Sequence, residues 1–197
     1  KSTVKEDLIL NSLLEAGTDV VTIFGKAWTV HAINVLKISP EENLKLIRES
    51  VSYLKDHKKE VIFDAEHFFD GYKDDKSYAM ECLKAAENAV ADSVCLCDTN
   101  GGTLTSEMDA ITKEVYRQMR VPLGIHTHND SDLAVANSLI AVENGFSMVQ
   151  GTINGFGERA GNVNLISVIP ALSIKMGIET IPQKSLKNLT ETSHFFY

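Results

Sequence analysis

The stretch PLGIHTHND, residues 122–130, carries two histidines, His126 and His128, directly after an apolar run. Every second side chain of a β-strand faces the same way, so this spacing places both imidazoles on one face. Two imidazoles on one face can bind a single metal ion. They can also be polar side chains that are satisfied by hydrogen bonds in the interior, so the pattern indicates a candidate metal site and leaves both interpretations open.

A second polar pair follows another apolar run. Asp64 and Glu66 in FDAEHFFDG are again two residues apart, so both carboxylates face the same side of a strand. Such a pair suits a general base with an orienting partner, and it suits two structural hydrogen-bond acceptors equally well. The segment GYKDDK just beyond is most simply a solvated loop.

The stretch NGFGERAGN, residues 154–162, combines glycines with the opposite charges of Glu158 and Arg159. Glycines let a backbone bend close to a ligand. We expect Asn162 to begin a helix whose N-terminal amides would favour an anion. The alternative is a turn followed by a helix N-cap.

Two further motifs have weaker signals. Cys95 and Cys97 share a strand face, but one C-x-C without a second cysteine pair is a weak zinc signal, and we interpret both as small core residues. His31 follows an apolar run in GKAWTVH, where it can bind substrate or cap the next segment.

Five short apolar runs rich in valine and isoleucine predict the β-strands that position these residues. They are VVTIF, EVIFD, SVCLCD, PLGIHTH and MVQGTING. The strongest helix start between them is SPEE, where Ser39 is the expected N-cap, Pro40 the first helical residue and Glu42 the partner in a capping box.

Other helices are expected before Gly17, over about residues 131–144, and from about Asn162 to near Gly177. Apolar residues at three-and-four spacing give the buried faces of three more. These faces are Leu44, Ile47, Val51 and Leu54; Tyr78, Cys82, Leu83, Ala86 and Val90; and Met108, Ile111, Val115 and Met119.

Alternation of buried strands with helices predicts an α/β fold with a parallel sheet. The sheet can be a doubly wound open sheet or part of a (βα)8 barrel, and a whole barrel takes about 250 residues. All the polar motifs follow the carboxyl ends of strands, and no strand precedes a GxGxxG or P-loop motif. The sequence therefore favours a partial (βα)8 TIM barrel of five strands with its active mouth at that end.

Composition excludes several classes of protein. The 197 residues are 44% hydrophobic with a net charge of -8 and no basic run, which argues against nucleic acid as a partner. No apolar run is long enough to cross a membrane. Three cysteines without framework spacing suit a reducing, cytoplasmic location. The chain begins at Lys1, so we expect a trimmed start.

The segments FDAEHFFDGYK, LCDTNGG, PLGIHTHNDSDLAVANSL and VQGTINGFGERAGNVNL resemble the acyltransferases that join acetyl-CoA to an α-keto acid, the α-isopropylmalate, homocitrate and citramalate synthases. AEHFFDGYK together with GKAW is most similar to the citramalate type, whose keto acid is pyruvate. The resemblance implies a (βα)8 barrel in which the five strands are numbers four to eight. Residues 1–178 would then be the C-terminal part of the barrel domain, and residues 179–197 the start of the segment after it.

The same resemblance implies roles for individual residues. His126, His128 and Asn162 match positions that bind a divalent ion, Mn2+, Mg2+ or Zn2+, while a further carboxylate ligand belongs to a first strand that is not among these residues. Glu66 matches a carboxylate implicated at the methyl group of acetyl-CoA, and we assign it as the base or its relay. The expected substrate contacts are His31, Asp64, Thr99 and Glu158. A homodimer is also expected.

The sequence departs from the citramalate pattern at two positions, with Ala160 in place of the usual cysteine and Val90 in place of a glycine. A carbon-carbon lyase on the same barrel would carry a catalytic cysteine in the last loop, and NGFGERAGN has none. A biotin-dependent carboxyltransferase would need a lysine that LCDTNGG lacks. The alternative from another class is a non-catalytic module or fragment that binds metal or keto acid.

Overall fold

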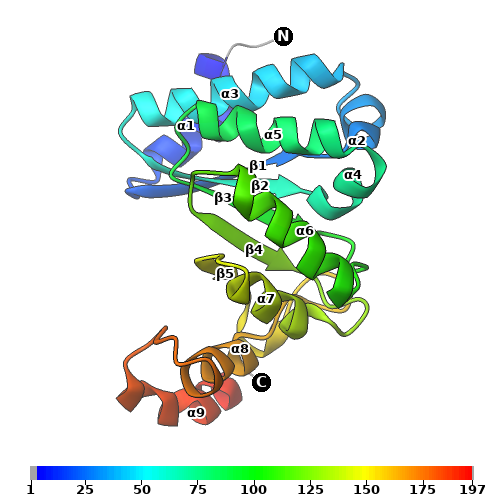
Figure 1. The fold of residues 1–197 in the computed structure, drawn as a ribbon. Coiled ribbons are helices and arrows are strands. Elements are labelled where there is room, and N and C mark those ends of the chain that lie inside the picture. Colours follow the sequence, from blue (N-terminus) through cyan, green and yellow to red (C-terminus); the bar gives the residue numbers. More distant parts are fainter. Residues whose placement is uncertain (1–3, 197) are drawn as a thin grey trace.

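The computed structural model describes residues 4–196 and contains one parallel sheet. Its strands are β1 (Val20–Lys26), β2 (Glu60–Glu66), β3 (Ser93–Asp98), β4 (Leu123–Thr127) and β5 (Met148–Gln150). They lie in the order β1-β2-β3-β4-β5, so each strand pairs with the next one along the chain (Figure 1). All five predicted strands and the parallel α/β class are confirmed.

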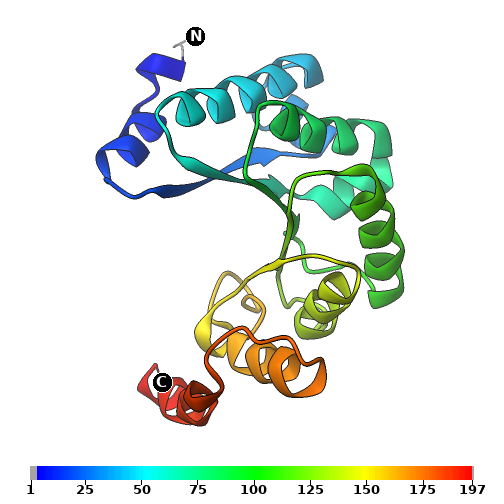
Figure 2. The same cartoon turned by 60° about the vertical axis from the view of Figure 1, so that its left-hand side comes forward.

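The helices lie outside an arc of strands, as Figure 2 shows. This arrangement is that of a partial (βα)8 barrel, because the strands curve in one direction and leave one side of the arc open. The α-helices are α1 (Leu8–Glu15), α2 (Thr29–Asn34), α3 (Pro40–Asp56), α4 (Phe68–Asp74), α5 (Lys76–Asn88), α6 (Thr105–Gln118), α7 (Ala134–Glu143), α8 (Leu165–Pro170) and α9 (Leu189–Phe195). A π-helical turn, Ala171–Lys175, continues α8.

Helix α3 begins as the sequence predicts. The Ser39 side chain accepts a hydrogen bond from the Glu42 backbone N–H, and the Glu42 carboxylate accepts one from the Ser39 N–H. Val51 and Leu54 of the predicted face are fully buried. A capping box and Pro40 at the first turn thus set the point where α3 starts to cover the sheet.

The strands have a helix-facing outer face and an inner face, which are distinct in composition. On β2, Val61, Phe63 and Ala65 are buried on the outer face, whereas Asp64 and Glu66 lie on the inner face. The Phe63 ring occupies the space beside Gly25 on β1. Apolar packing against the helices therefore orients every second residue of the strand inward, toward the open side of the arc.

Two short helices follow strands where no helix was predicted. Helix α2 carries His31. Helix α4 includes the first four residues of GYKDDK, so the prediction of a solvated loop is wrong for that part of the segment. Tyr72 is buried, and a side chain at Gly71 would collide with the Ala27 carbonyl. Close contact of α4 with the end of β1 explains the helix, because a glycine at that position allows the approach.

Three predicted helix boundaries or faces are wrong. Helix α7 starts at Ala134, where the Asn129 side chain accepts a hydrogen bond from the Ala134 N–H. Helix α8 starts at Leu165 with Asn164 as its N-cap, so Asn162 does not begin it. Val90 lies beyond α5, has φ 61° and is 64% exposed, and it therefore does not belong to the buried face.

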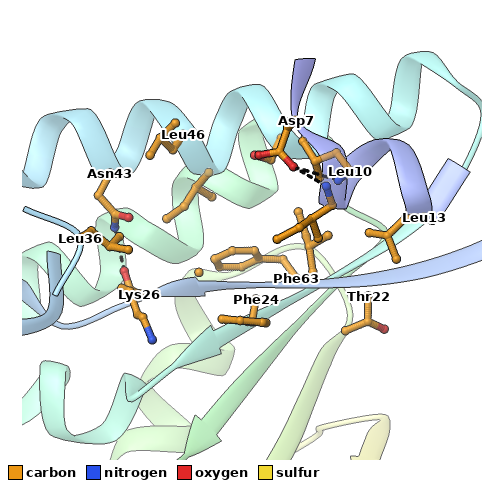
Figure 3. A pocket seen from close by; sticks show the side chains of 15 residues that line it. Asp7, Leu10, Leu13, Thr22, Phe24, Lys26, Leu36, Asn43, Leu46 and Phe63 are labelled. Atoms are coloured by element: carbon orange, nitrogen blue, oxygen red, sulfur yellow. Dashed lines mark hydrogen bonds between the residues drawn. The ribbon is translucent and has the colours of Figure 1, made fainter. Parts of the chain in front are cut away.

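A cavity of about 310 Å³ lies at the edge of the sheet between β1 and helices α1 and α3. Its lining includes Leu10, Leu13, Leu46, Ile47 and Phe63 (Figure 3). Most of the lining side chains are apolar, and none of the site residues predicted from the sequence lines this cavity, so the predicted polar motifs do not meet there. Within residues 4–196 no helix has both the length and the apolar character needed to cross a bilayer.

Candidate functional site

The polar side chains of four strands meet on the inner face at the carboxyl end of the sheet. In a parallel sheet, residues in register face the same side. Lys26 of β1 is in register with Glu66 of β2, Cys97 of β3 with His126 of β4, and His126 with Gln150 of β5. The register therefore brings together residues that are more than a hundred positions apart in the chain.

His126 and His128 face each other, with a distance of 3.3 Å between their Nε2 atoms. Two nitrogen ligands about 2.1 Å from one ion, at an angle of about 90–110°, are about 3.0–3.4 Å apart. The observed separation fits a pair of ligands to one cation. The predicted placement of both imidazoles together is confirmed, although His128 follows β4 rather than belonging to it.

Gln150 connects this pair to Asp64. Its amide Nε2 donates to Asp64 Oδ1 at 2.9 Å, and its Oε1 lies 3.1 Å from His126 Nδ1. Since Oε1 can only accept, His126 carries its proton on Nδ1 and presents the Nε2 lone pair to the centre of the site. Gln150 thus orients His126 in the way that metal-binding histidines are usually oriented by a second residue.

Burial raises the pKa of Asp64, and the hydrogen bond from Gln150 together with the neighbouring His126 partly offsets the rise. The shift is the behaviour of a carboxyl group held in a poorly solvated position. Asp64 is therefore a partly buried hydrogen-bond acceptor on the inner face, and Gln150 connects it to the His126 imidazole. We call this Asp64–Gln150–His126 chain of hydrogen bonds the relay.

Arg159 contacts the other nitrogen of His128. Its Nη2 lies 3.2 Å from His128 Nδ1, and the guanidinium also donates to both oxygens of Asp130, at 2.8 and 2.9 Å. Burial lowers the pKa of His128, and His126 and Arg159 lower it further. Because Arg159 can only donate, His128 carries its proton on Nε2 in this arrangement, and binding a cation at both Nε2 atoms requires Arg159 to release Nδ1.

Asn162 lies beside His128 rather than at a helix N-terminus. The two residues form an isolated antiparallel bridge, and Asn162 Nδ2 donates to the Phe156 carbonyl at 3.4 Å. A side chain at Gly161 would collide with the Gly155 carbonyl, so this glycine lets the loop fold back on itself rather than approach a ligand. The Asn162 Oδ1 atom is buried without a hydrogen-bond partner.

The donor set near the histidine pair is therefore two imidazoles and one amide oxygen. No group of three or more His, Cys, Asp or Glu side chains in the described part of the chain could hold a metal ion. The unpartnered amide oxygen is the kind of hard donor that Mg2+ and Mn2+ accept, and the imidazoles suit Zn2+ or Mn2+ as well. The residues present fit part of a metal site.

The other half of the site contains charged and aromatic side chains at the ends of β1 and β2. Lys26 Nζ forms an ion pair with Glu66 Oε2. Next to it the rings of His31 and His67 are edge to face with centroids 4.1 Å apart. Burial lowers the pKa of both histidines, and both Nδ1 atoms are buried without a hydrogen-bond partner, although that of His67 lies 4.0 Å from Asp70 Oδ2.

Thr99 and Glu158, two of the expected substrate contacts, differ in position. Thr99 Oγ1 accepts a hydrogen bond at 2.8 Å from the backbone of His67, which has φ 56°, so Thr99 lies at the mouth and supports this left-handed residue. Glu158 is exposed and pairs with Arg159 at 3.2 Å. The structure does not place Glu158 with the inner-face residues.

Lys26, His67 and Gln150 were not among the site residues predicted from the sequence. All three occupy or directly follow the carboxyl end of a strand, the signal that identified the other candidates. Lysine and glutamine are common surface residues, so only the register shows that they face inward. The expectation for the cysteines is correct, because Cys95 and Cys97 are both buried, and burial raises the thiol pKa of Cys95 well above its usual value.

Solved structures share this fold. The chain superimposes with a TM-score of 0.82 and 17% identity on an HMG-CoA lyase from Bacillus subtilis, covering 95% of this chain and 65% of that one. An HMG-CoA lyase from Acinetobacter baumannii, solved with coenzyme A and 3-methylmalate, gives a TM-score of 0.76 and 19% identity, over 93% of this chain and 63% of that one. At these identities the likeness concerns the fold.

Sequence comparison gives closer relatives. The chain is 55% identical to an (R)-citramalate synthase from Geobacter sulfurreducens over its whole length, and 56% identical to one from Aquifex aeolicus over 98% of it. It spans about 37% of the length of each. A probable 2-isopropylmalate synthase from Methanosarcina acetivorans is 38% identical over 90% of this chain and 33% of its own length. Residues 3–195 match the model of the HMGL-like family, and the chain belongs to that family.

Proposed function

We propose that the protein condenses acetyl-CoA with pyruvate, forming citramalate and free CoA. The observation that carries this proposal is the pair of facing histidine Nε2 atoms on the same inner face as the Glu66 carboxylate. The identity of more than half of the chain to two (R)-citramalate synthases supports the choice of substrates.

The reaction needs three operations. A proton leaves the methyl group of acetyl-CoA, the resulting carbon nucleophile attacks the ketone carbon of pyruvate, and water then cleaves the thioester to release CoA. Glu66 is the base for the first operation, because its carboxylate lies at the mouth and can reach a bound substrate. A base within hydrogen-bond reach of the methyl group accelerates the reaction by about 10²–10⁴-fold in typical enzymes.

His126, His128 and the Oδ1 atom of Asn162 would hold the divalent cation. When bound, Mn2+, Mg2+ or Zn2+ polarises the ketone and stabilises the developing alkoxide. Gln150 keeps the His126 lone pair directed into the site, and Asp64 fixes Gln150. His31 and Thr99 are proposed substrate contacts, since a buried Nδ1 atom without a partner and a hydroxyl group lie at the mouth.

A second candidate is 2-isopropylmalate synthesis, in which a longer α-keto acid replaces pyruvate. The probable 2-isopropylmalate synthase that is 38% identical favours it. The two candidates share the chemistry at the inner face and differ only in the keto acid. A carbon-carbon lyase has support from the fold alone.

The test is CoA release measured with a thiol reagent in the full-length protein, with acetyl-CoA, Mn2+ and either pyruvate or 2-ketoisovalerate. We expect release with pyruvate, and its loss in a His126→Ala, His128→Ala double variant. His57→Ala is the matched control, because His57 is exposed at the end of α3. Release with 2-ketoisovalerate alone would correct the substrate, and no release with any keto acid would reject the proposal.

Three further properties belong to the same proposal. The barrel segment ends near residue 178, and residues 179–197 begin the part that follows it. Helix α9 in that part contacts the site's last loop, because Asn154 Nδ2 donates to the Ser193 carbonyl at 2.8 Å. We also propose a homodimer, and a reducing, cytoplasmic location, which the three free buried cysteines support.

A further inference from the structure

The Lys26 ammonium is the cation that lies on the inner face beside the proposed base. The Lys26 and Glu66 side chains are 17% and 24% exposed and form an ion pair across β1 and β2. By contrast, Lys45 pairs with Glu49 within α3 on the outside of the molecule, with side chains 66% and 45% exposed. Lys26 is thus a partly desolvated charge at the site, not a surface lysine.

Buried polar groups hold the backbone of Lys26 in place. Its carbonyl accepts a hydrogen bond at 2.8 Å from Asn43 of α3, which is 2% exposed and also donates to the Tyr78 hydroxyl at 2.7 Å. The following residue, Ala27, donates its N–H to the Glu66 carbonyl. In Figure 3, Asn43 meets the Lys26 carbonyl, while the Lys26 side chain points away from α3. This anchoring fixes the point from which the ammonium reaches Glu66.

Stability alone does not explain a lysine at this position. Exposed ion pairs contribute about 0–1 kcal/mol to the free energy of unfolding. In a more buried pair, the cost of removing both charges from water offsets their attraction, so the pair adds little to stability. An apolar pair could fill the same space, since the inner face carries Ile62, Cys95 and Cys97 as well as its polar residues. The charge therefore points to a chemical role.

We propose that Lys26 is a catalytic residue that stabilises the enolate oxygen formed from acetyl-CoA. The inference rests on the proposed function. A C–H bond of the acetyl methyl group breaks, its proton passes to Glu66, and its electron pair forms the C=C bond while the thioester C=O electrons move to oxygen. Glu66 becomes neutral, and the Lys26 ammonium, no longer paired with a carboxylate, donates a hydrogen bond to that oxygen.

This assignment conserves charge at the site. Before proton transfer, the ammonium faces a carboxylate, and afterwards it faces an enolate of the same charge. A cation that is already in place when negative charge moves from one oxygen to another needs little reorganisation, which is the main way enzymes stabilise such intermediates. When the enolate carbon attacks the ketone carbon of pyruvate, the C=C electron pair forms the new C–C bond, the thioester C=O double bond is restored, and the ketone C=O pair becomes an alkoxide. The proton held by Glu66 then passes to this alkoxide through a water molecule, and Lys26 pairs again with the Glu66 carboxylate.

The experiment compares Lys26→Met, Lys26→Arg and the control Lys45→Met in the full-length protein with pyruvate. Loss of one donor to an oxyanion typically reduces kcat by about 10²–10³-fold, so we expect a decrease of that size for Lys26→Met. The KM for pyruvate should stay within about threefold of wild type, since in this assignment Lys26 does not bind the keto acid. Lys26→Arg should recover at least part of the loss because it keeps the charge, and Lys45→Met should match wild type.

A second readout separates a catalytic role from a structural one. If enolate formation is selectively slowed, the deuterium isotope effect on kcat with methyl-deuterated acetyl-CoA increases in Lys26→Met. Circular dichroism checks folding, and Lys26→Gln replaces the methionine variant with the same expectation if that variant is unfolded.

Three results would overturn the inference. The first is a kcat for Lys26→Met near that of wild type, and the second is an unchanged isotope effect with a much higher KM for pyruvate, which would make Lys26 a keto-acid contact. In both, wild type still releases CoA and the proposed function stands. The third is no CoA release by wild type with any keto acid, in which case both proposals fail.

Discussion

Asp64 and Asp98 are the same residue type at the same edge of the sheet, but they face opposite sides. Both are substantially buried, and burial raises the pKa of each. Asp98 faces outward and accepts hydrogen bonds from the hydroxyl and the N–H of Thr103, at 2.8 and 3.4 Å. Asp64 faces inward and accepts one from Gln150. The outward carboxylate closes a loop, whereas the inward one belongs to the relay that reaches the histidines.

The same contrast extends to neighbouring residues. Thr127 faces outward and pairs with Ser138 of α7 at 2.9 Å, while its neighbour His126 faces inward. Among the described residues, three of the buried side-chain atoms without partners belong to His31, His67 and Asn162 at the mouth, and the fourth is Asn137 Oδ1 on α7. The outward groups Asp98 and Thr127 have hydrogen-bond partners within the protein, whereas three polar atoms at the mouth have none and are available to a ligand. This difference is what identifies the site.

The largest expected effect tests the outer face. Phe63→Ala should lower the free energy of unfolding by about 3–5 kcal/mol, because Phe63 is 1% exposed and its ring packs beside Gly25. Urea unfolding followed by circular dichroism measures the change. Ile174→Ala, at an exposed apolar residue, serves as the control and should lose far less. Equal losses in the two variants would show that the outer face of β2 is not part of the core.

The next effect tests the inner face. Gln150→Leu removes the group that orients His126, and loss of such a partner usually weakens metal binding by about 10–100-fold. Titration calorimetry with Mn2+ measures the affinity. Gln118→Leu on the exposed side of α6 should leave it unchanged. An unchanged affinity in Gln150→Leu would mean that the relay does not prepare His126 as a ligand.

A smaller effect concerns the helix layer, where Val90 has φ 61°. A β-branched residue in this left-handed region is strained, so Val90→Gly should raise the free energy of unfolding by about 1 kcal/mol. Ala89→Gly is the matched control, since Ala89 has an ordinary φ of -84° and should lose stability. Thermal unfolding of the two variants decides the matter. A decrease in both would show that Val90 is not strained.

The smallest effect returns to the two aspartates. A carboxyl group whose pKa is raised on folding is destabilising when ionised, and that cost disappears as the pH falls through its folded pKa. Asp64→Asn should therefore be more stable than wild type at pH 7 and lose this advantage below the usual pKa of 3.8. Asp98→Asn relieves the same cost of a buried charge, but it leaves one of the two Thr103 donors without an acceptor. Because an unpaired buried donor carries its full desolvation cost, we expect this variant to be less stable than wild type at pH 7. Unfolding curves at pH 7 and below pH 3.8 compare them, and the same sign for both variants at pH 7 would remove the distinction between the faces.

Local chemistry made several features predictable. The capping box at Ser39 and the alternation on β2 depend on residues within a few positions of one another, so the sequence alone locates helix α3 and the face of Asp64. Helix α4 escaped prediction because its start follows His67, a left-handed residue that Thr99 of another strand supports. The start of α8 was placed too early because the bridge between Asn162 and His128 is a non-local pairing.

The sequence by itself determined which polar residues end each strand. It also determined that His126 and His128 face the same side of their strand, and that Asp64 and Glu66 face the same side of theirs. Only the tertiary structure decided which of them meet. The pairing of Lys26 with Glu66, the relay from Gln150 to Asp64, and the contact of Arg159 with His128 all depend on the register and curvature of the sheet. Register is set by packing of the whole outer face against the helices, and no short stretch of sequence carries that information.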